Sequence, residues 1–334
     1  MLSCILHEIT ALNSPGSEFS TVESTLQKLI YKMKIENNNN KIGEYIVTGY
    51  SRGLLSSWMG FPQFGILFDV GDGASVELNS TVGTYKHLAI THAHMDHISG
   101  LASFVNLRHR LNPSLKTEIH YPLQAQNRLG IQLSMVGDRR VKSIELDPIN
   151  ALECKNKSID IGGRRKLKPF PTNHCGSGCN SSVGYLITET RKYRKREYDS
   201  LSQEEMRNMS ERGIDISEER DYPLVAYVGD SPKLNDEQIS FLNGVELLVL
   251  ESTMVNKSDF EEPEALSHSS IEESLQAASK IKPKHLILNH VSPRYHDAFV
   301  THLMENESTK IFGSEYPFTI HRLLGSQFFK LRNE

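Results

Sequence analysis

The sequence predicts a layered α/β domain, and two patterns carry this expectation. From residue 42 onward, short runs rich in Val, Ile and Leu alternate with stretches of helical periodicity. Several of the apolar runs are followed directly by Asp or His, residue types that burial alone does not require. Mixed runs of this kind pack as sheets covered by helices.

Six apolar runs are expected as buried strands. They are residues 64–70, 87–91, 183–188, 223–229, 246–251 and 284–289. Two helices are expected from capping boxes, in which a serine precedes a glutamate by three residues. These pairs are Ser202 with Glu205 and Ser270 with Glu273.

Composition narrows the class of protein. Hydrophobic residues make up 38% and charged residues 23% of the 334 residues, enough apolar content for a sizeable core. No apolar run reaches the length of a membrane span, and the start lacks the basic residues of a secretory signal. Four irregularly spaced cysteines do not make a disulfide framework, so we expect an intracellular, reducing compartment, the cytoplasm or nucleus.

The chain is expected to have two parts. Residues 1–40 are rich in polar residues and end in "ENNNN", which is typical of a loop or linker. We interpret them as an N-terminal extension of unknown role: targeting, regulation or an interface. Residues 41–334 would form the folded domain.

The stretch "AITHAHMDHISG", residues 89–100, has the densest group of side chains that can bind a metal. It places His92, His94, Asp96 and His97 within six positions, although the whole chain has only 14 histidines. In an extended segment His92 and His94 point to the same side, and a turn then presents the other two at a helix start. A hydrogen-bonded cluster or a solvated loop is the alternative, but a metal site is favoured.

Further candidate ligands follow other strands. Asp69, Asp230 and His290 come at the carboxyl ends of apolar runs, and His174 shortly precedes one, so a sheet can deliver them to one edge. A single zinc ion takes three or four ligands, whereas two ions that share a carboxylate use more. Imidazole and carboxylate without thiolate suit a catalytic pair of Zn²⁺ or Mn²⁺ ions.

At this point the motifs resemble a known family. "THAHMDH" resembles the His-x-His-x-Asp-His signature of the metallo-β-lactamase superfamily. "FDVGDG", "NHCGSGCNSSVGYLI", "VAYVGDSP" and "LILNHVSPRY" follow in the order of its other motifs. Together with "LESTM" and "LSHSS", the set is similar to the short form of ribonuclease Z, a tRNA 3′-end endonuclease, over residues 43–325. The resemblance implies an αββα sandwich, two packed mixed sheets with helices outside.

The resemblance also implies metal ligands. The first metal ion would be held by His92, His94 and His174, the second by Asp96, His97 and His290, and both by Asp230. Asp69 would orient a ligand imidazole. A water activated by the two ions would attack a phosphodiester, and Asp96 would also accept its proton.

Other roles are implied beside the metals. His268 would protonate the leaving oxygen while Glu251 fixes its tautomer. Ser292 and Arg294 would hold a phosphate, although a surface salt bridge is an equal alternative for Arg294. Two departures from the family pattern remain: Val291 and Pro293 would alter the phosphate pocket slightly, and Cys175 and Cys179 lie beside His174, where tight packing is favoured over a metal or redox role.

An insertion at about residues 190–222 would form a projecting arm. Its start carries the basic residues Arg191, Lys192, Arg194, Lys195 and Arg196. A second basic cluster comprises Arg164, Arg165, Lys166 and Lys168. These could neutralise RNA phosphates, with Tyr193 stacking on a base, or form a solvated charge run. The family grips tRNA with an arm at this place, which favours RNA.

We therefore expect a hydrolase, an endoribonuclease that removes the 3′ trailer of tRNA precursors. A phosphodiesterase for cyclic nucleotides or other small molecules is the alternative, since related enzymes keep the same ligands without a long arm. A non-catalytic scaffold is disfavoured because such proteins tend to lose ligands. The resemblance implies a homodimer, and no membrane partner is expected.

Overall fold

A computed structural model describes residues 41–137, 143–174, 182–259, 261 and 264–331. The expected extension, residues 1–40, and the pair Cys175 and Cys179 lie outside the described residues. The chain divides into two compact units, residues 1–46 and 47–334. In the first unit, β1 (Lys41–Ile42) and β2 (Tyr45–Ile46) pair as antiparallel strands. All that follows concerns the second unit.

Within the described residues, the first sheet of this unit has six strands in the order β3-β4-β5-β6-β7-β8. They are β3 (Thr48–Arg52), β4 (Ser56–Phe61), β5 (Ile66–Phe68), β6 (His87–Ala89), β7 (Thr117–Pro122) and β8 (Ile144–Ile149). Strands β5 to β8 are parallel, whereas β3, β4 and β5 pair in antiparallel fashion. The accompanying helices are α3 (Ala74–Leu78), α4 (Met95–Ile98), α5 (Leu101–Leu111) and α6 (Gln126–Ser134).

In the described part of the chain, the second sheet has eight strands in the order β16-β15-β14-β13-β12-β11-β10-β9. They are β9 (Ile159–Gly162), β10 (Arg165–Pro171), β11 (Val183–Arg194), β12 (Ser217–Tyr227), β13 (Leu247–Glu251), β14 (His285–Asn289), β15 (Thr319–Leu324) and β16 (Gln327–Lys330). Strands β12 to β15 are parallel. Its helices are α8 (Gln203–Glu211), α9 (Asp236–Phe241), α10 (Glu264–Ser267), α11 (Ile271–Ile281) and α12 (Asp297–Phe312).

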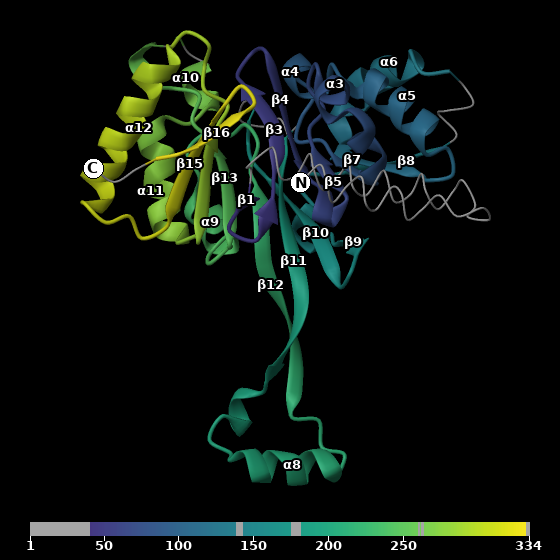
Figure 1. Cartoon of the computed structure of the whole chain (residues 1–334), viewed down its shortest axis with the longest axis vertical. Coiled ribbons are helices and arrows are strands. Elements are labelled where there is room, and N and C mark those ends of the chain that lie inside the picture. The colour runs from purple at the N-terminus through teal and green to yellow at the C-terminus, as the bar shows by residue number, and fades with distance from the viewer. Residues whose placement is uncertain (1–40, 138–142, 175–181, 260, 262–263, 332–334) are drawn as a thin grey trace, which may run out of the picture. The chain divides into compact units, whose positions relative to one another are not determined.

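The two sheets face each other, with helices on their outer sides (Figure 1). Between the sheets, the rings of Phe68 and Tyr227 stack with centroids 4.8 Å apart. The hydroxyl of Tyr185 on β11 donates a hydrogen bond to the carbonyl of Ile90, after β6, at 2.7 Å. On the outer sides, each sheet forms its own apolar core with its helices. The expected two-sheet sandwich is therefore confirmed.

The local signals in the sequence compare closely with the structure. Both capping boxes are present, at the starts of α8 and α11.

The helix expected after the histidine-rich stretch is divided into α4 and α5 at Gly100. A Cβ on Gly100 would lie 2.2 Å from the carbonyl oxygen of Gly71, so only glycine permits this close approach. Asp96 and His97 therefore lie on a separate short helix against the end of β5.

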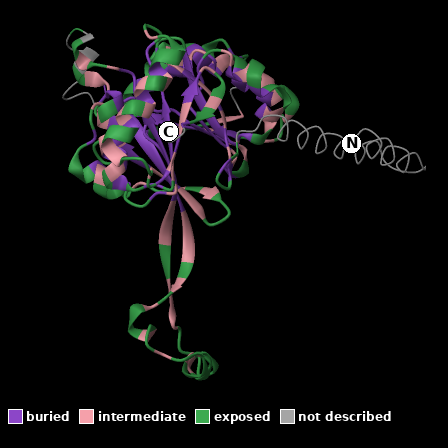
Figure 2. Cartoon of the chain, turned by 60° about the vertical axis from the view of Figure 1, so that its left-hand side comes forward, coloured by how far each residue is buried: buried purple, intermediate pink, exposed green. Residues whose placement is uncertain are grey.

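Strands β11 and β12 run on beyond the sheet as a two-stranded hairpin that ends in α8 (Figure 1). Residues 190–222 of this hairpin are called the arm below. No residue of α8 is buried, as Figure 2 also shows. The helix therefore contributes nothing to the core. Among the residues that the structure describes, no helix is long and apolar enough to cross a membrane.

Candidate metal centre

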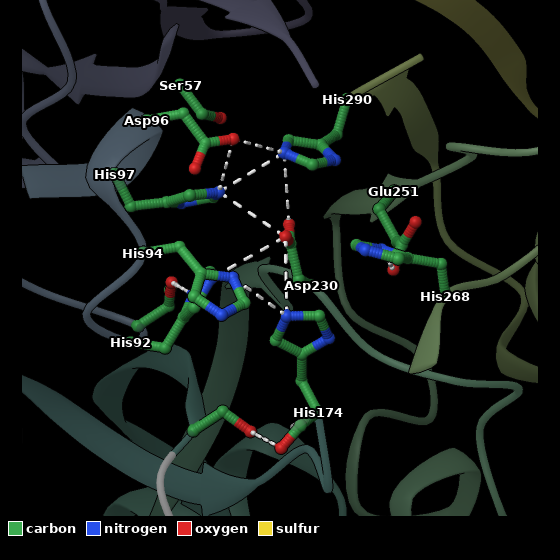
Figure 3. A network of polar contacts seen from close by, with 12 residues as sticks. Ser57, His92, His94, Asp96, His97, His174, Asp230, Glu251, His268 and His290 are labelled. Carbon is green, nitrogen blue, oxygen red and sulfur yellow. Dashed lines mark hydrogen bonds and ion pairs between the residues drawn. The ribbon is translucent and has the colours of Figure 1, made fainter. Parts of the chain in front are cut away.

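Seven histidine and aspartate side chains converge at the carboxyl ends of the strands (Figure 3). Their donor atoms form two groups, in each of which the atoms lie within 4.8 Å of one another. One group is His92, His94, His174 and Asp230, and the other is Asp96, His97 and His290. The structure thus brings together all the residues for which the sequence predicts metal binding.

Asp230, which follows β12, lies between the two groups. Its Oδ2 atom is 3.6 Å from Nε2 of His92, 3.8 Å from Nε2 of His174 and 3.4 Å from Nε2 of His97. Its Oδ1 atom is 3.5 Å from Nε2 of His290. One carboxylate therefore faces donors of both groups, which is the position of a bridging ligand.

Unusual backbone geometry positions some of these side chains. Asp69, at the end of β5, has φ 54°, and His290, at the end of β14, has φ 58°. Both values lie in the left-handed region, which costs a non-glycine residue on the order of 1–3 kcal/mol. The backbone N–H of His290 is held there by Oγ of Ser51 at 2.9 Å. Such strain persists only where neighbouring contacts fix it, and it is concentrated here at the candidate site.

Four of the histidines are oriented through the ring nitrogen that faces away from the centre. These contacts are His92 Nδ1 to Thr91 Oγ1 at 3.0 Å, His97 Nδ1 to Asp69 Oδ2 at 2.8 Å, His174 Nδ1 to the Ser267 carbonyl at 2.9 Å, and His290 Nδ1 to Thr253 Oγ1 at 3.0 Å. Each outward N–H donates, so Nε2 keeps its lone pair toward the centre. Thr91 and Thr253 were not singled out from the sequence, although Thr91 directly precedes His92 and Thr253 lies within "LESTM".

The donor set suits a divalent cation. Nε2 of His92 is buried and, among the described residues, has no hydrogen-bond partner, which fits a metal-binding atom. Burial alone would raise the pKa of Asp230, but the nearby imidazoles of His290 and His97 hold it well below its usual value. His94 is exposed and Asp96 is half-buried, so the centre is open to solvent. Imidazole and carboxylate ligands fit Zn²⁺ or Mn²⁺.

Asp69 is fully buried behind the centre. Besides the contact with His97, its Oδ1 accepts the backbone N–H of Thr91 at 2.7 Å, and its Oδ2 faces the hydroxyl of Tyr227 at 3.3 Å. The hydroxyl of Thr91 also lies 3.0 Å from both carboxylate oxygens. Asp69 therefore links two strand ends and fixes the ring of His97.

Glu251 and His268 lie beside the centre as a bonded pair. Nδ1 of His268 donates to Oε1 of Glu251 at 2.9 Å. The ring of His268 is 4.7 Å from the ring of His174 and 5.8 Å from that of His290, between centroids. Burial opposes protonation of His268, but the Glu251 carboxylate outweighs it and raises the pKa of His268 to about 9. This pair can deliver a proton at neutral pH.

Ser292 and Arg294 follow β14, after His290. Ser292 is buried, and its hydroxyl accepts the backbone N–H of Arg294 at 3.4 Å. The side chain of Arg294 is exposed to solvent. Ser292 thus shapes the turn in which Arg294 lies.

The basic residues of the arm lie among acidic ones. Residues 190–222 contain eight basic and nine acidic side chains. Arg191 pairs with Glu189 at 2.8 Å and lies over the ring of Tyr222, while Nζ of Lys195 donates to the carbonyl of Asp215 at 2.7 Å. Lys192, Arg194 and Arg196 are exposed and have no ion pair within the described chain.

The second basic cluster is paired throughout. Its ion pairs are Arg164 with Glu219 at 2.8 Å, Arg165 with Glu189 at 3.3 Å, Lys166 with Asp221 at 3.3 Å and Lys168 with Asp221 at 2.8 Å. These pairs hold β10 to the base of the arm. The sequence could not show them, because the partners are 24 to 55 residues apart in the chain.

Curated relatives match most of the chain. It is 26% identical over 291 residues to the chloroplastic tRNase Z TRZ2 of Arabidopsis thaliana, which covers 84% of this chain and 76% of the relative. It is 29% identical over 259 residues to tRNase Z TRZ1 of the same plant, with 76% and 88% covered. No family model matches the chain.

Solved structures share its fold. The metallo-β-lactamase fold protein YhfI of Bacillus subtilis superposes with a TM-score of 0.58 at 13% identity, covering 85% of this chain and 98% of that one. The short form of human tRNase Z superposes with a TM-score of 0.53 at 16% identity, again with 85% and 98% covered. The expected metallo-β-lactamase fold is confirmed.

Proposed function

We propose that this chain, a relative of the ribonuclease Z proteins, is a metal-dependent endoribonuclease that removes the 3′ trailer of tRNA precursors. The observation that carries the proposal is the bonded pair of Glu251 and His268 beside the centre around Asp230. A donor cluster alone fits many hydrolases, whereas a protonated imidazole next to it fits cleavage of a bond whose leaving oxygen needs a proton.

In this proposal seven residues hold two divalent ions, Zn²⁺ in the first place and Mn²⁺ as the alternative. His92, His94 and His174 would hold one ion, Asp96, His97 and His290 would hold the other, and Asp230 would contribute to both sites. Such a pair, when bound, neutralises phosphate charge and makes water a stronger nucleophile at neutral pH.

The protein's own groups then divide the proton transfers. Asp96 is half-buried, and its Oδ2 accepts the backbone N–H of Leu54 at 3.1 Å, which holds the carboxylate at the open side of the centre. There it can accept a proton from the attacking water. His268 keeps one N–H on Glu251 and presents the other to the leaving oxygen.

Substrate contacts would come from two places. Ser292 and Arg294 are proposed to hold the phosphate next to the cleaved bond, through the exposed guanidinium of Arg294. In the arm, the basic residues Arg191, Lys192, Arg194, Lys195 and Arg196 are proposed to face RNA. The exposed Lys192, Arg194 and Arg196 carry most of this role, because Arg191 is already paired with Glu189.

The same proposal covers the setting of the enzyme. Residues 41–334 form the hydrolase domain with its arm, residues 1–40 an extension, and the chain acts as a homodimer. A reducing compartment, cytoplasm or nucleus, is proposed from the cysteine content.

The test compares RNA and small substrates. Purified chain with Zn²⁺ or Mn²⁺ is incubated with a tRNA precursor that carries a 3′ trailer and, separately, with 3′,5′-cyclic nucleotides. The matched variants are His94→Ala, a deletion of residues 191–220, and the triple change of Lys192, Arg194 and Arg196 to Gln. We expect trailer cleavage that His94→Ala and the deletion abolish, and a KM that the triple change raises with kcat nearly kept. Opening of a cyclic nucleotide with an intact precursor would identify a small-molecule phosphodiesterase instead.

A further inference from the structure

A second group of histidine and carboxylate side chains lies across β6, β7 and β8. His87 begins β6, Glu118 and His120 lie on β7, and Asp147 lies on β8. In the sheet register His87 pairs with Glu118, and His120 pairs with Asp147, so the four side chains share one face. This is the face toward the other sheet, since the alternate residues belong to the helix-side core. Neither the proposed reaction nor its metal centre uses them.

Three donor atoms of this group converge. Nδ1 of His87 is 3.2 Å from Nε2 of His120 and 3.4 Å from Oε2 of Glu118. All three lie within 4.8 Å of one another. Two ligands at about 2.0–2.1 Å from a tetrahedral zinc ion are separated by roughly 3.3 Å, so two of the three separations already match a zinc site. The third separation, between a donor atom of Glu118 and one of His120, is within 4.8 Å.

Asp147 orients the ring of His120 for metal binding. Nδ1 of His120 donates to Oδ2 of Asp147 at 2.9 Å, which leaves the Nε2 lone pair pointing at His87. A carboxylate behind a histidine is the arrangement that orients metal-bound imidazoles. Burial lowers the pKa of His87 to about 4, which favours the neutral, ligating form of its ring.

The charges of two lysines repel a cation at this place, but each lysine pairs with a carboxylate oxygen that does not face the histidines. Lys86 pairs with Oε1 of Glu118 at 2.7 Å, and Lys157 pairs with Oδ1 of Asp147 at 2.5 Å. The oxygens that face the histidines are the other two, Oε2 and Oδ2. The lysines lower the affinity for a cation, and removal of one should raise it.

The group is separate from the catalytic centre. His87 precedes His92 by five residues on one extended segment, which spans roughly 16 Å at about 3.3 Å per residue. The donors also come from the starts and middles of the strands, whereas the catalytic donors follow the strand ends.

We propose that His87, Glu118 and His120 bind a further divalent cation, best fitted by Zn²⁺, with Asp147 orienting His120. The ion joins β6 to β7 and stabilises the folded first sheet, since a ligand that binds only the native state raises stability. The site stands independently of the proposed nuclease activity.

The test counts bound zinc. Full-length chain is saturated with Zn²⁺, freed of excess by gel filtration and analysed by elemental mass spectrometry, as wild type and as His120→Gln, Glu118→Gln and His109→Gln. His109, on α5, is the matched control outside the group. We expect His120→Gln and Glu118→Gln each to lose one equivalent of zinc while they keep the wild-type rate of trailer cleavage. The zinc content of the control His109→Gln should not change. Equal zinc content in all four proteins would overturn the proposal.

Two further measurements guard against misfolding of the buried His120 variant. Lys86→Met keeps every donor and should lower the Kd for Zn²⁺ at this site, measured by competition with a chelator in an Asp230→Asn background. Cobalt bound in that background should show the visible spectrum of a tetrahedral site, and Glu118→Gln should remove it. A Kd unaffected by Lys86→Met together with no cobalt spectrum would also reject the site.

Discussion

The carboxylate oxygen of Glu251 that contacts His268 is also held by the backbone. Oε1 lies 2.9 Å from Nδ1 of His268 and accepts the backbone N–H of Ser231 at 2.8 Å. The other oxygen accepts the N–H and the hydroxyl of Thr253. That hydroxyl also contacts the ring of His290. One buried carboxylate thus orients the proposed acid and is linked to a proposed metal ligand.

The first prediction concerns this acid. His268→Ala should lower kcat for trailer cleavage by roughly 10²–10⁴-fold with little change in KM, because a proton donor acts mainly in the transition state. A substrate with sulfur in place of the leaving oxygen needs no proton, so it should be cleaved by the variant and the wild type at similar rates. Single-turnover kinetics on both substrates measure the difference.

Glu251→Gln should lower kcat for trailer cleavage less than His268→Ala does, because Glu251 acts through His268. It too should cleave the sulfur substrate at a rate similar to that of the wild type. The exposed His302 on α12 provides a control, and His302→Ala should leave both rates unchanged. An equal loss on the oxygen and sulfur substrates would show that His268 has a structural role and does not donate the proton.

A second prediction concerns the orientation of His97. Asp69→Asn keeps the side-chain shape but weakens the 2.8 Å contact to Nδ1 of His97, so affinity for the divalent ion should fall about 10–100-fold. Competition with a chelator measures it, and circular dichroism checks the fold. Asp72→Asn is the matched control, because Asp72 is exposed and its side chain makes no contact with the centre. Unchanged affinity in Asp69→Asn would remove Asp69 from the proposed site.

Much of this site was accessible from the sequence because its residues follow strand ends. A run such as "HLAIT" or "HLILN" marks its own strand, and the next polar residue then falls at the sheet edge, as His92 and His290 do. The capping boxes were equally local, since Ser202 and Ser270 bond to residues only three positions away.

Features that depend on pairing between distant strands were not accessible. His87 and Glu118 are ordinary strand residues until the register of β6 and β7 places them opposite each other. The charge of the arm is a second case. Its basic run suggests a cationic surface, but pairing of β11 with β12 sets Lys192 opposite Glu219 and Tyr193 opposite Glu218.

A third prediction concerns Gly229, which precedes Asp230. Its φ is 70°, and a Cβ would lie 2.7 Å from the side chain of Thr91. Gly229→Ala should therefore displace Thr91 or Asp230, destabilise the fold by about 1–3 kcal/mol and lower metal affinity. Gly244 has φ 72° with open space around it, so Gly244→Ala carries the backbone cost alone. Equal metal affinity in the two variants would contradict the steric argument.

A fourth prediction concerns His321 on β15, far in sequence from the centre. Burial, followed by repulsion from His285 and Lys330, lowers the pKa of His321 from 6.5 to about 4. The unfolded chain therefore takes up this proton near pH 6.5, whereas the folded chain does so only near pH 4. Stability from the neutral ring is present above pH 6.5 and is lost as the pH falls toward 4, where the dependence levels off.

The size of this effect follows from partial burial. The ring is partly exposed, so solvent screening reduces the loss of folding free energy that corresponds to the pKa shift to on the order of 1 kcal/mol. Urea unfolding of wild type and His321→Gln at pH 7, 6, 5 and 4 measures it, at one fixed metal concentration. The wild type should lose about 1 kcal/mol more than the variant over this range, because glutamine does not titrate, whereas His302→Gln should follow the wild type. Parallel curves for wild type and His321→Gln would show that the proton binds His321 equally well in both states, which the partial burial of this residue on the central part of β15 argues against.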